Sequence, residues 1–171
     1  MTFVKVVAAL LVAYLVHLLG VSATPLFARV FDPFLLVLVW YSLRTGPVGA
    51  ELIGTGTGLL QDALAGGLFG LHAFADTVVG YAVTLAAQRV VVGQQAARVL
   101  IFAAAAALQQ AVLVLLMLAM VDQAPLPSPG AVIGKIVTTS LLGAVFISME
   151  SRARAQWSSW QRRRSRILRF R

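Results

Sequence analysis

The chain contains apolar runs that are too long for the interior of a small soluble domain. The clearest covers residues 99–121, which include no charged side chain. As a helix this run would be about 34 Å long, enough to cross the ~30 Å hydrocarbon core of a bilayer. Of the 171 residues, 60% are hydrophobic and 12% are charged, whereas soluble domains carry about 25% charged residues. We therefore expect an integral membrane protein.

The apolar runs are continuous and lack the alternating pattern of barrel strands, which favours a helical bundle. We predict an all-α fold with a six-transmembrane-helix domain over residues 1–150 and an arginine-rich amphipathic tail over residues 151–171. The expected spans cover residues 3–21, 26–43, 47–65, 69–87, 99–121 and 130–149.

The second span is expected to be irregular because Asp32 and Pro33 interrupt it. Proline suits the first turn of a helix, and the aspartate before it can cap that turn. A helix over residues 33–43 would be only about 16 Å long. The residues before Asp32 must therefore contribute a kinked or broken half, which is tolerated where protein covers it.

Basic residues predict the orientation of the spans. With six spans, nearly all basic residues outside the spans fall on one side of the membrane, and only Arg29 falls on the other. Lys135 lies a little inside the sixth span. Positively charged residues favour the cytoplasmic side, so both termini are expected to be cytoplasmic. The residues that gather on that side are the eight arginines after residue 150 and Lys5, Arg44, Arg89 and Arg98.

Two neighbouring stretches, residues 54–62 and 66–81, are apolar enough for a membrane but rich in glycine, and each holds an aspartate. An aspartate at mid-membrane costs ~3 kcal/mol on insertion scales, so Asp62 and Asp76 require partners. The turn between the two expected helices is short, and helices joined in this way run antiparallel. The sequence therefore predicts a tight helical hairpin.

The turn also predicts which residues of the hairpin face each other. If it is centred on its two adjacent glycines, Asp62 lies level with His72, and Asp76 lies level with Thr57 and Gly58. A buried acid there would be protonated or hydrogen-bonded rather than left as a bare charge. We expect a polar seam, closely packed through small residues. Its residues are Gly54, Gly58, Asp62, Gly70, His72, Asp76 and Gly80.

Catalytic and metal-dependent functions are not expected. The chain has no cysteine and only two histidines, far apart, which matches no metal-ligand spacing. No serine occupies a nucleophile-elbow motif, and the glycines do not follow a strand as in a phosphate-binding loop. Asp62 and Asp76 are level with different partners, so they are not a catalytic pair. We predict a protein that is not an enzyme and needs no cofactor.

The tail holds eight of the fourteen lysine and arginine residues. We expect it to contact anionic lipid, where each arginine could add ~1 kcal/mol, or a cytoplasmic protein. Tryptophans favour the membrane interface. No nucleic-acid partner is expected. The residues expected to make these contacts are Trp157, Trp160, Arg162, Arg163 and Arg164.

The hairpin carries a recognisable pattern. The run Gly-x-x-x-Gly-Leu-Leu-Gln-Asp over residues 54–62, followed by Leu-Phe-Gly-Leu-His-Ala-Phe over 68–74 and by Gly80-Tyr81, resembles the MreD family of rod shape-determining proteins. The similar stretch covers about residues 47–90. The family-like positions are Gly54, Gly58, Leu59, Asp62, Gly70, Leu71 and Gly80.

This resemblance implies a non-enzymatic inner-membrane scaffold of the bacterial elongation machinery. Such proteins bind MreC, which has one span and a periplasmic domain, and are linked to the actin-like MreB and to the glycosyltransferase RodA with its transpeptidase partner. It also implies a fold similar to the substrate-binding subunits of energy-coupling-factor vitamin transporters. The arginine-rich tail matches no family pattern.

Two other functions stay open. A small-molecule (vitamin-like) binding subunit or transporter would need a pocket with convergent polar groups, and Gln109, Gln110 and Lys135 could contribute to it. A membrane enzyme of lipid metabolism would need several acids or histidines at one membrane boundary, where the sequence offers only Asp62 and His72.

Overall fold

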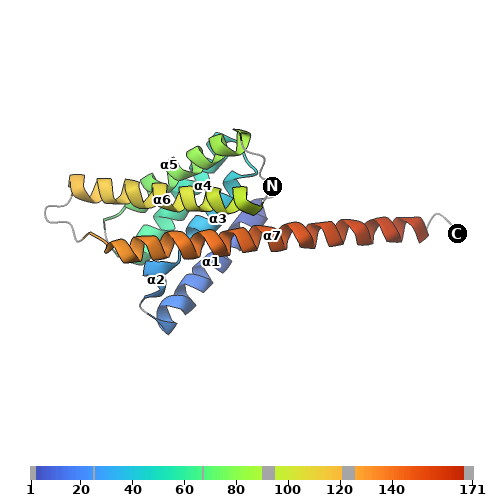
Figure 1. The fold of residues 1–171 in the computed structure, drawn as a ribbon, viewed down its shortest axis with the longest axis horizontal. Helices are drawn as coiled ribbons and strands as arrows, with labels where there is room; N and C mark the ends of the chain where they lie inside the picture. Colours follow the sequence, from blue (N-terminus) through green and yellow to red (C-terminus); the bar gives the residue numbers. More distant parts are fainter. Residues whose placement is uncertain (1–2, 25, 67, 90–94, 121–125, 168–171) are drawn as a thin grey trace.

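The computed structural model describes residues 3–24, 26–66, 68–89, 95–120 and 126–167, and only the backbone of Phe3, Gln95 and 153–167. These residues form seven helices and no strand (Figure 1). The helices are α1 (Phe3–Ala23), α2 (Phe27–Val30), α3 (Pro33–Ser42), α4 (Pro47–Ala65), α5 (Leu71–Arg89), α6 (Gln95–Met120) and α7 (Pro129–Ile167).

Three of these helices are long and apolar enough to cross a membrane: α1 over Val4–Ala23, α6 over Ala96–Met120 and α7 over Pro129–Arg152. The protein is therefore a helical membrane protein. Helices α4 and α5 are not among the three because their glycines, threonines and aspartates lower their mean hydropathy. Mean hydropathy includes every residue of a helix, whether it faces lipid or protein. Thr57 and Asp76 lower the value although they are buried in the bundle.

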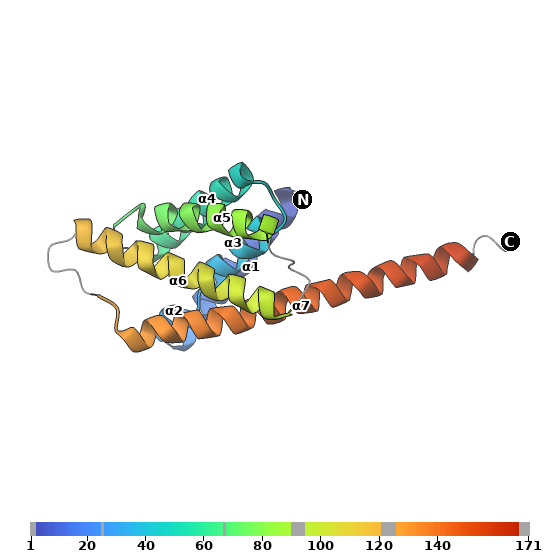
Figure 2. The same cartoon turned by 45° about the horizontal axis from the view of Figure 1, so that its top comes forward.

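Helix α3 lies at the centre of the bundle and contacts α1, α4, α5, α6 and α7. Figures 1 and 2 show it enclosed by the longer helices. It is apolar all round, the pattern of a helix buried on every side. Phe34, Leu35, Leu38 and Val39 are fully buried. The second expected span is thus a short core helix, α3, preceded by the one-turn helix α2.

The break between α2 and α3 occurs where Asp32 and Pro33 predicted it. Phe31 and Asp32 are extended, and Pro33 begins α3. The carbonyl of Val30 accepts a hydrogen bond from the hydroxyl of Thr138 on α7. Buried backbone groups need such partners, so α7 stabilises the break.

Helices α6 and α7 pack as an antiparallel pair (Figure 2). A Cβ on Gly143 would lie 2.5 Å from the Phe102 ring, which therefore occupies the space that a side chain would fill. Helix α6 begins at Gln95, so Arg98, which lies just before the fifth expected span, is in its first turn. An Arg98 nitrogen lies 3.4 Å from the Ser148 hydroxyl on α7, and this contact favours the earlier start.

A polar contact ties the middle of α7 to α3. One Glu150 oxygen lies 2.5 Å from an Arg44 nitrogen and 2.7 Å from Trp40 Nε1. The Arg44 guanidinium also lies 5.1 Å from the centre of the Trp40 ring, a favourable cation–π geometry.

Helix α7 continues through residue 150 without a break and extends beyond the bundle in both views (Figures 1 and 2). Its 39 residues include the start of the predicted tail. The tail is therefore a helix continuous with the last span as far as Ile167. The side chains of Trp157, Trp160, Arg162, Arg163 and Arg164 lie outside the described part of the structure.

Candidate functional site

The hairpin of α4 and α5 packs backbone against backbone through three glycines. A Cβ on Gly54 would lie 2.4 Å from the carbonyl oxygen of Asp76, and one on Gly58 would lie 2.4 Å from the backbone nitrogen of Ala73. A Cβ on Gly80 would lie 2.6 Å from a carbonyl oxygen of α4. Real Cβ atoms do not approach so closely, so each of these positions requires glycine.

The register of the hairpin differs from the predicted one. The backbone of Asp76 lies level with Gly54, and that of Ala73 lies level with Gly58. The reason is the turn: α4 ends with Gly66 in the left-handed conformation, and α5 starts only at Leu71. Gly70, which directly precedes α5, lies beside Asp62 in the last turn of α4. The Asp76 side chain still reaches Thr57, whose hydroxyl donates to it at 3.3 Å, as the sequence predicted.

Asp62 lies at the end of α4 and accepts hydrogen bonds from the start of α5. Its Oδ2 lies 2.8 Å from the backbone nitrogen of Gly70 and 3.3 Å from that of Ala73. Its Oδ1 lies 3.1 Å from the backbone nitrogen of His72 and 2.7 Å from His72 Nδ1. The carboxylate therefore accepts from N–H groups that a helix start leaves unpaired. Gly70 has a φ of 103°, which favours glycine.

Threonines add a second polar contact along the hairpin. The hydroxyls of Thr55 and Thr77 lie 2.8 Å apart, and each lies within hydrogen-bond distance of a carbonyl of its own helix. Each hydroxyl has one hydrogen, so when one threonine donates to its helix carbonyl, the other can donate to that threonine. Thr84, further along α5, faces α3 instead, and its hydroxyl lies 3.3 Å from the carbonyl oxygen of Ser42 and 3.0 Å from that of Gly80. The polar seam thus runs from Asp62 to the middle of both helices.

Asp32 lies at the centre of a buried polar cluster that the sequence did not predict. Its Oδ1 accepts from the backbone nitrogens of Phe34 and Leu35 at 3.1 and 3.0 Å, the expected cap of α3. Its Oδ2 lies 3.0 Å from Gln61 Nε2 and 3.0 Å from Lys135 Nζ. Asp32 is fully buried, so its charge requires this cation and these donors.

Gln109 connects this cluster to the hairpin. Its Nε2 lies 2.7 Å from Asp76 Oδ1 and 3.3 Å from Asp32 Oδ2. The other Asp76 oxygen lies 3.3 Å from the Thr57 hydroxyl. The Oε1 atoms of Gln61 and Gln109 are buried without a hydrogen-bond partner among the described residues. The cluster joins side chains from α4, α5, α6 and α7 around the α2–α3 break.

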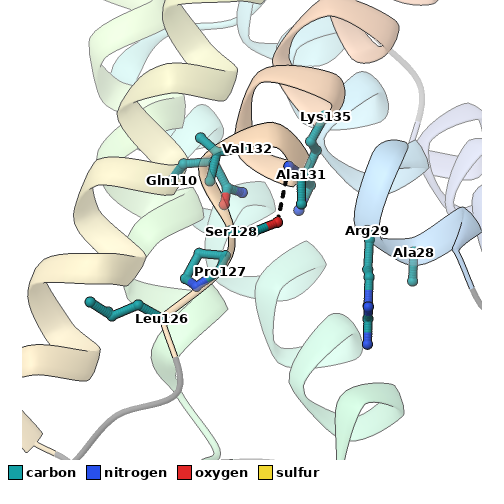
Figure 3. Close-up of a pocket in the computed structure, with 9 residues that line it drawn as sticks. All are labelled: Ala28, Arg29, Gln110, Leu126, Pro127, Ser128, Ala131, Val132 and Lys135. Atoms are coloured by element: carbon teal, nitrogen blue, oxygen red, sulfur yellow. Dashed lines mark hydrogen bonds between the residues drawn. The ribbon is translucent and has the colours of Figure 1, made fainter.

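A cavity of about 450 Å³ opens between α2, α6 and the start of α7 (Figure 3). We call it the α2–α7 cavity. Arg29 lines it from α2, and Ser128 and Lys135 line it from the α7 side. Lys135 belongs both to this wall and to the buried cluster. The remaining lining residues are Ala28, Gln110, Leu126, Pro127, Ala131 and Val132.

The predicted hairpin residues lie together in the structure, but the two aspartates have different hydrogen-bond partners. Asp62 caps α5, whereas Asp76 belongs to the cluster of Asp32 and Gln109. Among the described residues, no group of three histidines or acids could hold a metal ion. Sequence reasoning missed Asp32 and Gln61 as cluster members. The sequence signal that could have identified them is the presence of single polar residues within otherwise apolar spans.

Searches against protein families, characterised proteins and solved structures found no match.

Proposed function

We propose that the chain is a non-enzymatic scaffold of the MreD type in the bacterial inner membrane. It would bind MreC and help to position peptidoglycan synthesis, acting indirectly with MreB, RodA and the transpeptidase partner of RodA. The observation that carries this proposal is that Gly54, Gly58, Asp62 and Gly70, which give the resemblance, all take part in one hairpin contact. A shared motif with a defined structural role supports a shared fold better than residues scattered over the surface.

The hydrogen bonding of the hairpin acids supports a role without catalysis. Both oxygens of Asp62 and both oxygens of Asp76 accept from protein donors. A general base must instead reach a proton of its substrate. We infer that the two acids stabilise the hairpin against which a partner helix packs.

The proposed topology has six spans and both termini in the cytoplasm. Helices α1, α6 and α7 are each long and apolar enough to form one span. Helix α4, helix α5 and the α2–α3 pair would form the other three spans. A single-span partner with a periplasmic domain would then contact the outer halves of the first four spans. Exposed leucines and valines on α1 offer an apolar surface for such a helix.

Co-purification with MreC tests the proposal. Gly58→Leu should reduce the amount of MreC recovered from detergent and round the cells, because a side chain there must push α5 away from α4. Gly56→Leu is the matched control, since a Cβ at Gly56 has no neighbour within 4 Å. Two results would contradict the proposal. One is a normal cell shape in a strain that lacks the gene, and the other is an unchanged amount of MreC recovered with both variants.

The α2–α7 cavity favours a second candidate, a small-molecule binding subunit. Its volume of about 450 Å³ lies within the range of ligand sites. Mass spectrometry of the purified protein would detect a retained native ligand, and a thermal-shift screen with vitamins and lipids would identify binders. A protein that carries no ligand and responds to none of them would remove this candidate.

A further inference from the structure

The α2–α7 cavity is lined by hydrogen-bond donors that are positively charged, Arg29 and Lys135, or neutral, Ser128. The Arg29 guanidinium is exposed and has no ion-pair or hydrogen-bond partner among the described residues, so its five N–H donors are available. Ser128 Oγ lies 3.4 Å from the backbone nitrogen of Ala131, from which it accepts. Its own hydroxyl hydrogen is then free to donate. Ser128 directly precedes α7, whose N-terminus itself favours anions, and Arg29 lines the same cavity from α2.

Lys135 is fixed at the inner wall of this cavity. Its ammonium lies 3.0 Å from Asp32 Oδ2 on the side of the bundle core, while the side chain also lines the cavity. An ammonium has three N–H donors. Asp32 accepts from one of them, which leaves two N–H donors that this ion pair does not use. A buried lysine held in this way keeps its position without a ligand present.

A second cavity adjoins the first and has a different character. Its volume is about 190 Å³, and it shares Gln110, Pro127 and Lys135 with the α2–α7 cavity. The remaining lining residues are mostly apolar: Leu113, Val114 and Met117, together with His72. A ligand that fills both spaces must have an anionic group beside an apolar chain.

We propose that the two cavities bind a phosphate-bearing amphiphile, such as a phospholipid with a small head group. The phosphate lies between Arg29, Ser128 and Lys135, and the first part of an acyl chain occupies the apolar cavity. Phosphate suits these donors because its several oxygens can accept from a bidentate arginine, a lysine and a hydroxyl together. This inference rests on the second candidate function, since it names the ligand class of the same cavity.

The experiment measures affinity of the purified full chain in maltoside detergent for three probes: dihexanoyl phosphatidic acid, glycerol 3-phosphate and dihexanoylglycerol. The complete amphiphile should bind about tenfold or more tightly than either half. Arg29→Gln should weaken its binding about tenfold, because hydrogen bonds between charged groups are lost. Arg89→Gln, an exposed arginine at the end of α5, is the matched control and should bind as the parent protein does.

A second variant tests the apolar part. Val114→Phe fills the smaller cavity and should bring the affinity of the amphiphile down to that of glycerol 3-phosphate. Equal binding by Arg29→Gln and the parent protein would overturn the inference, as would equal binding of all three probes. If a vitamin binds and the phosphate probes do not, this inference fails while the second candidate function stands. Absence of any ligand overturns both.

Discussion

At the start of α5, backbone N–H groups point at one carboxylate that belongs to a different helix. Asp62 accepts from Gly70, His72 and Ala73, and no residue of α5 itself supplies this cap. In a membrane such N–H groups have no water to pair with. The start of α5 therefore depends on the end of α4, and a single side chain links their stability.

Replacing Asp62 tests this link. Asp62→Ala should lower the free energy of unfolding in detergent by roughly 3 kcal/mol, because several N–H groups lose a charged acceptor. Asp62→Asn keeps one acceptor oxygen and should lower it less. Titration with a denaturing detergent, followed by circular dichroism, measures both. Equal losses for the two variants would show that acceptor number does not matter here.

The Asp32–Lys135 pair allows a second measurement on single residues. Removing one member of a buried ion pair leaves an uncompensated charge, so Lys135→Met should destabilise the fold by about 3–5 kcal/mol. Asp32→Asn keeps the oxygen that caps α3 and removes the charge. The double variant should then be more stable than the sum of the single losses by about 1 kcal/mol or more. Strict additivity in this cycle would mean that the two groups do not interact.

At the scale of elements, α4 and α5 approach so closely that only glycine fits between them. Gly54 and Gly58 face α5, whereas Gly56 faces open space on the same helix. The three glycines of this run look equivalent in the sequence. Their different surroundings give a comparison within one turn of one helix.

Alanine at each glycine should have opposite effects. Gly58→Ala places a Cβ against the α5 backbone and should destabilise the protein by about 1–3 kcal/mol. Gly56→Ala meets nothing and should stabilise the helix by about 0.5–1 kcal/mol, since glycine is a poor helix former. Thermal unfolding in detergent gives both values. A loss at Gly56 as large as that at Gly58 would contradict the observed packing.

Local sequence signals predicted where the helices begin, break and turn better than they predicted which side chains pair across the bundle. Asp32 and Pro33 predicted the break in the second span because capping and proline geometry depend only on neighbours. The short turn likewise predicted an antiparallel hairpin. The pairing of Asp32 with Lys135 joins residues 103 positions apart, and no local pattern carries such a distance. The predicted contact of Asp62 with His72 is present, but the backbone of Asp76 lies level with Gly54 instead of Gly58, because α5 starts only at Leu71.

At the scale of the whole molecule, the orientation in the membrane can be tested directly because the chain has no cysteine. Single cysteines can be added at exposed positions at opposite ends of the proposed topology, Ser128 and Gln88. Ser128→Cys should react with an impermeant maleimide in intact bacterial cells. Gln88→Cys should react only after the inner membrane is permeabilised. The reverse pattern would invert the topology.

The continuity of α7 has a mechanical consequence. Its first turns line the α2–α7 cavity, its middle is tied to α3 at Glu150, and its far end includes arginines beyond the bundle. Taking Glu150 as a fulcrum, the arm to Lys135 is ~22 Å and the arm to Ile167 is ~26 Å. The arms are nearly equal, so a tilt that moves one end moves the other by a similar distance in the opposite direction. If the proposed ligand shifts the first turns of α7, this one helix would carry the displacement past Glu150 to the arginines beyond the bundle.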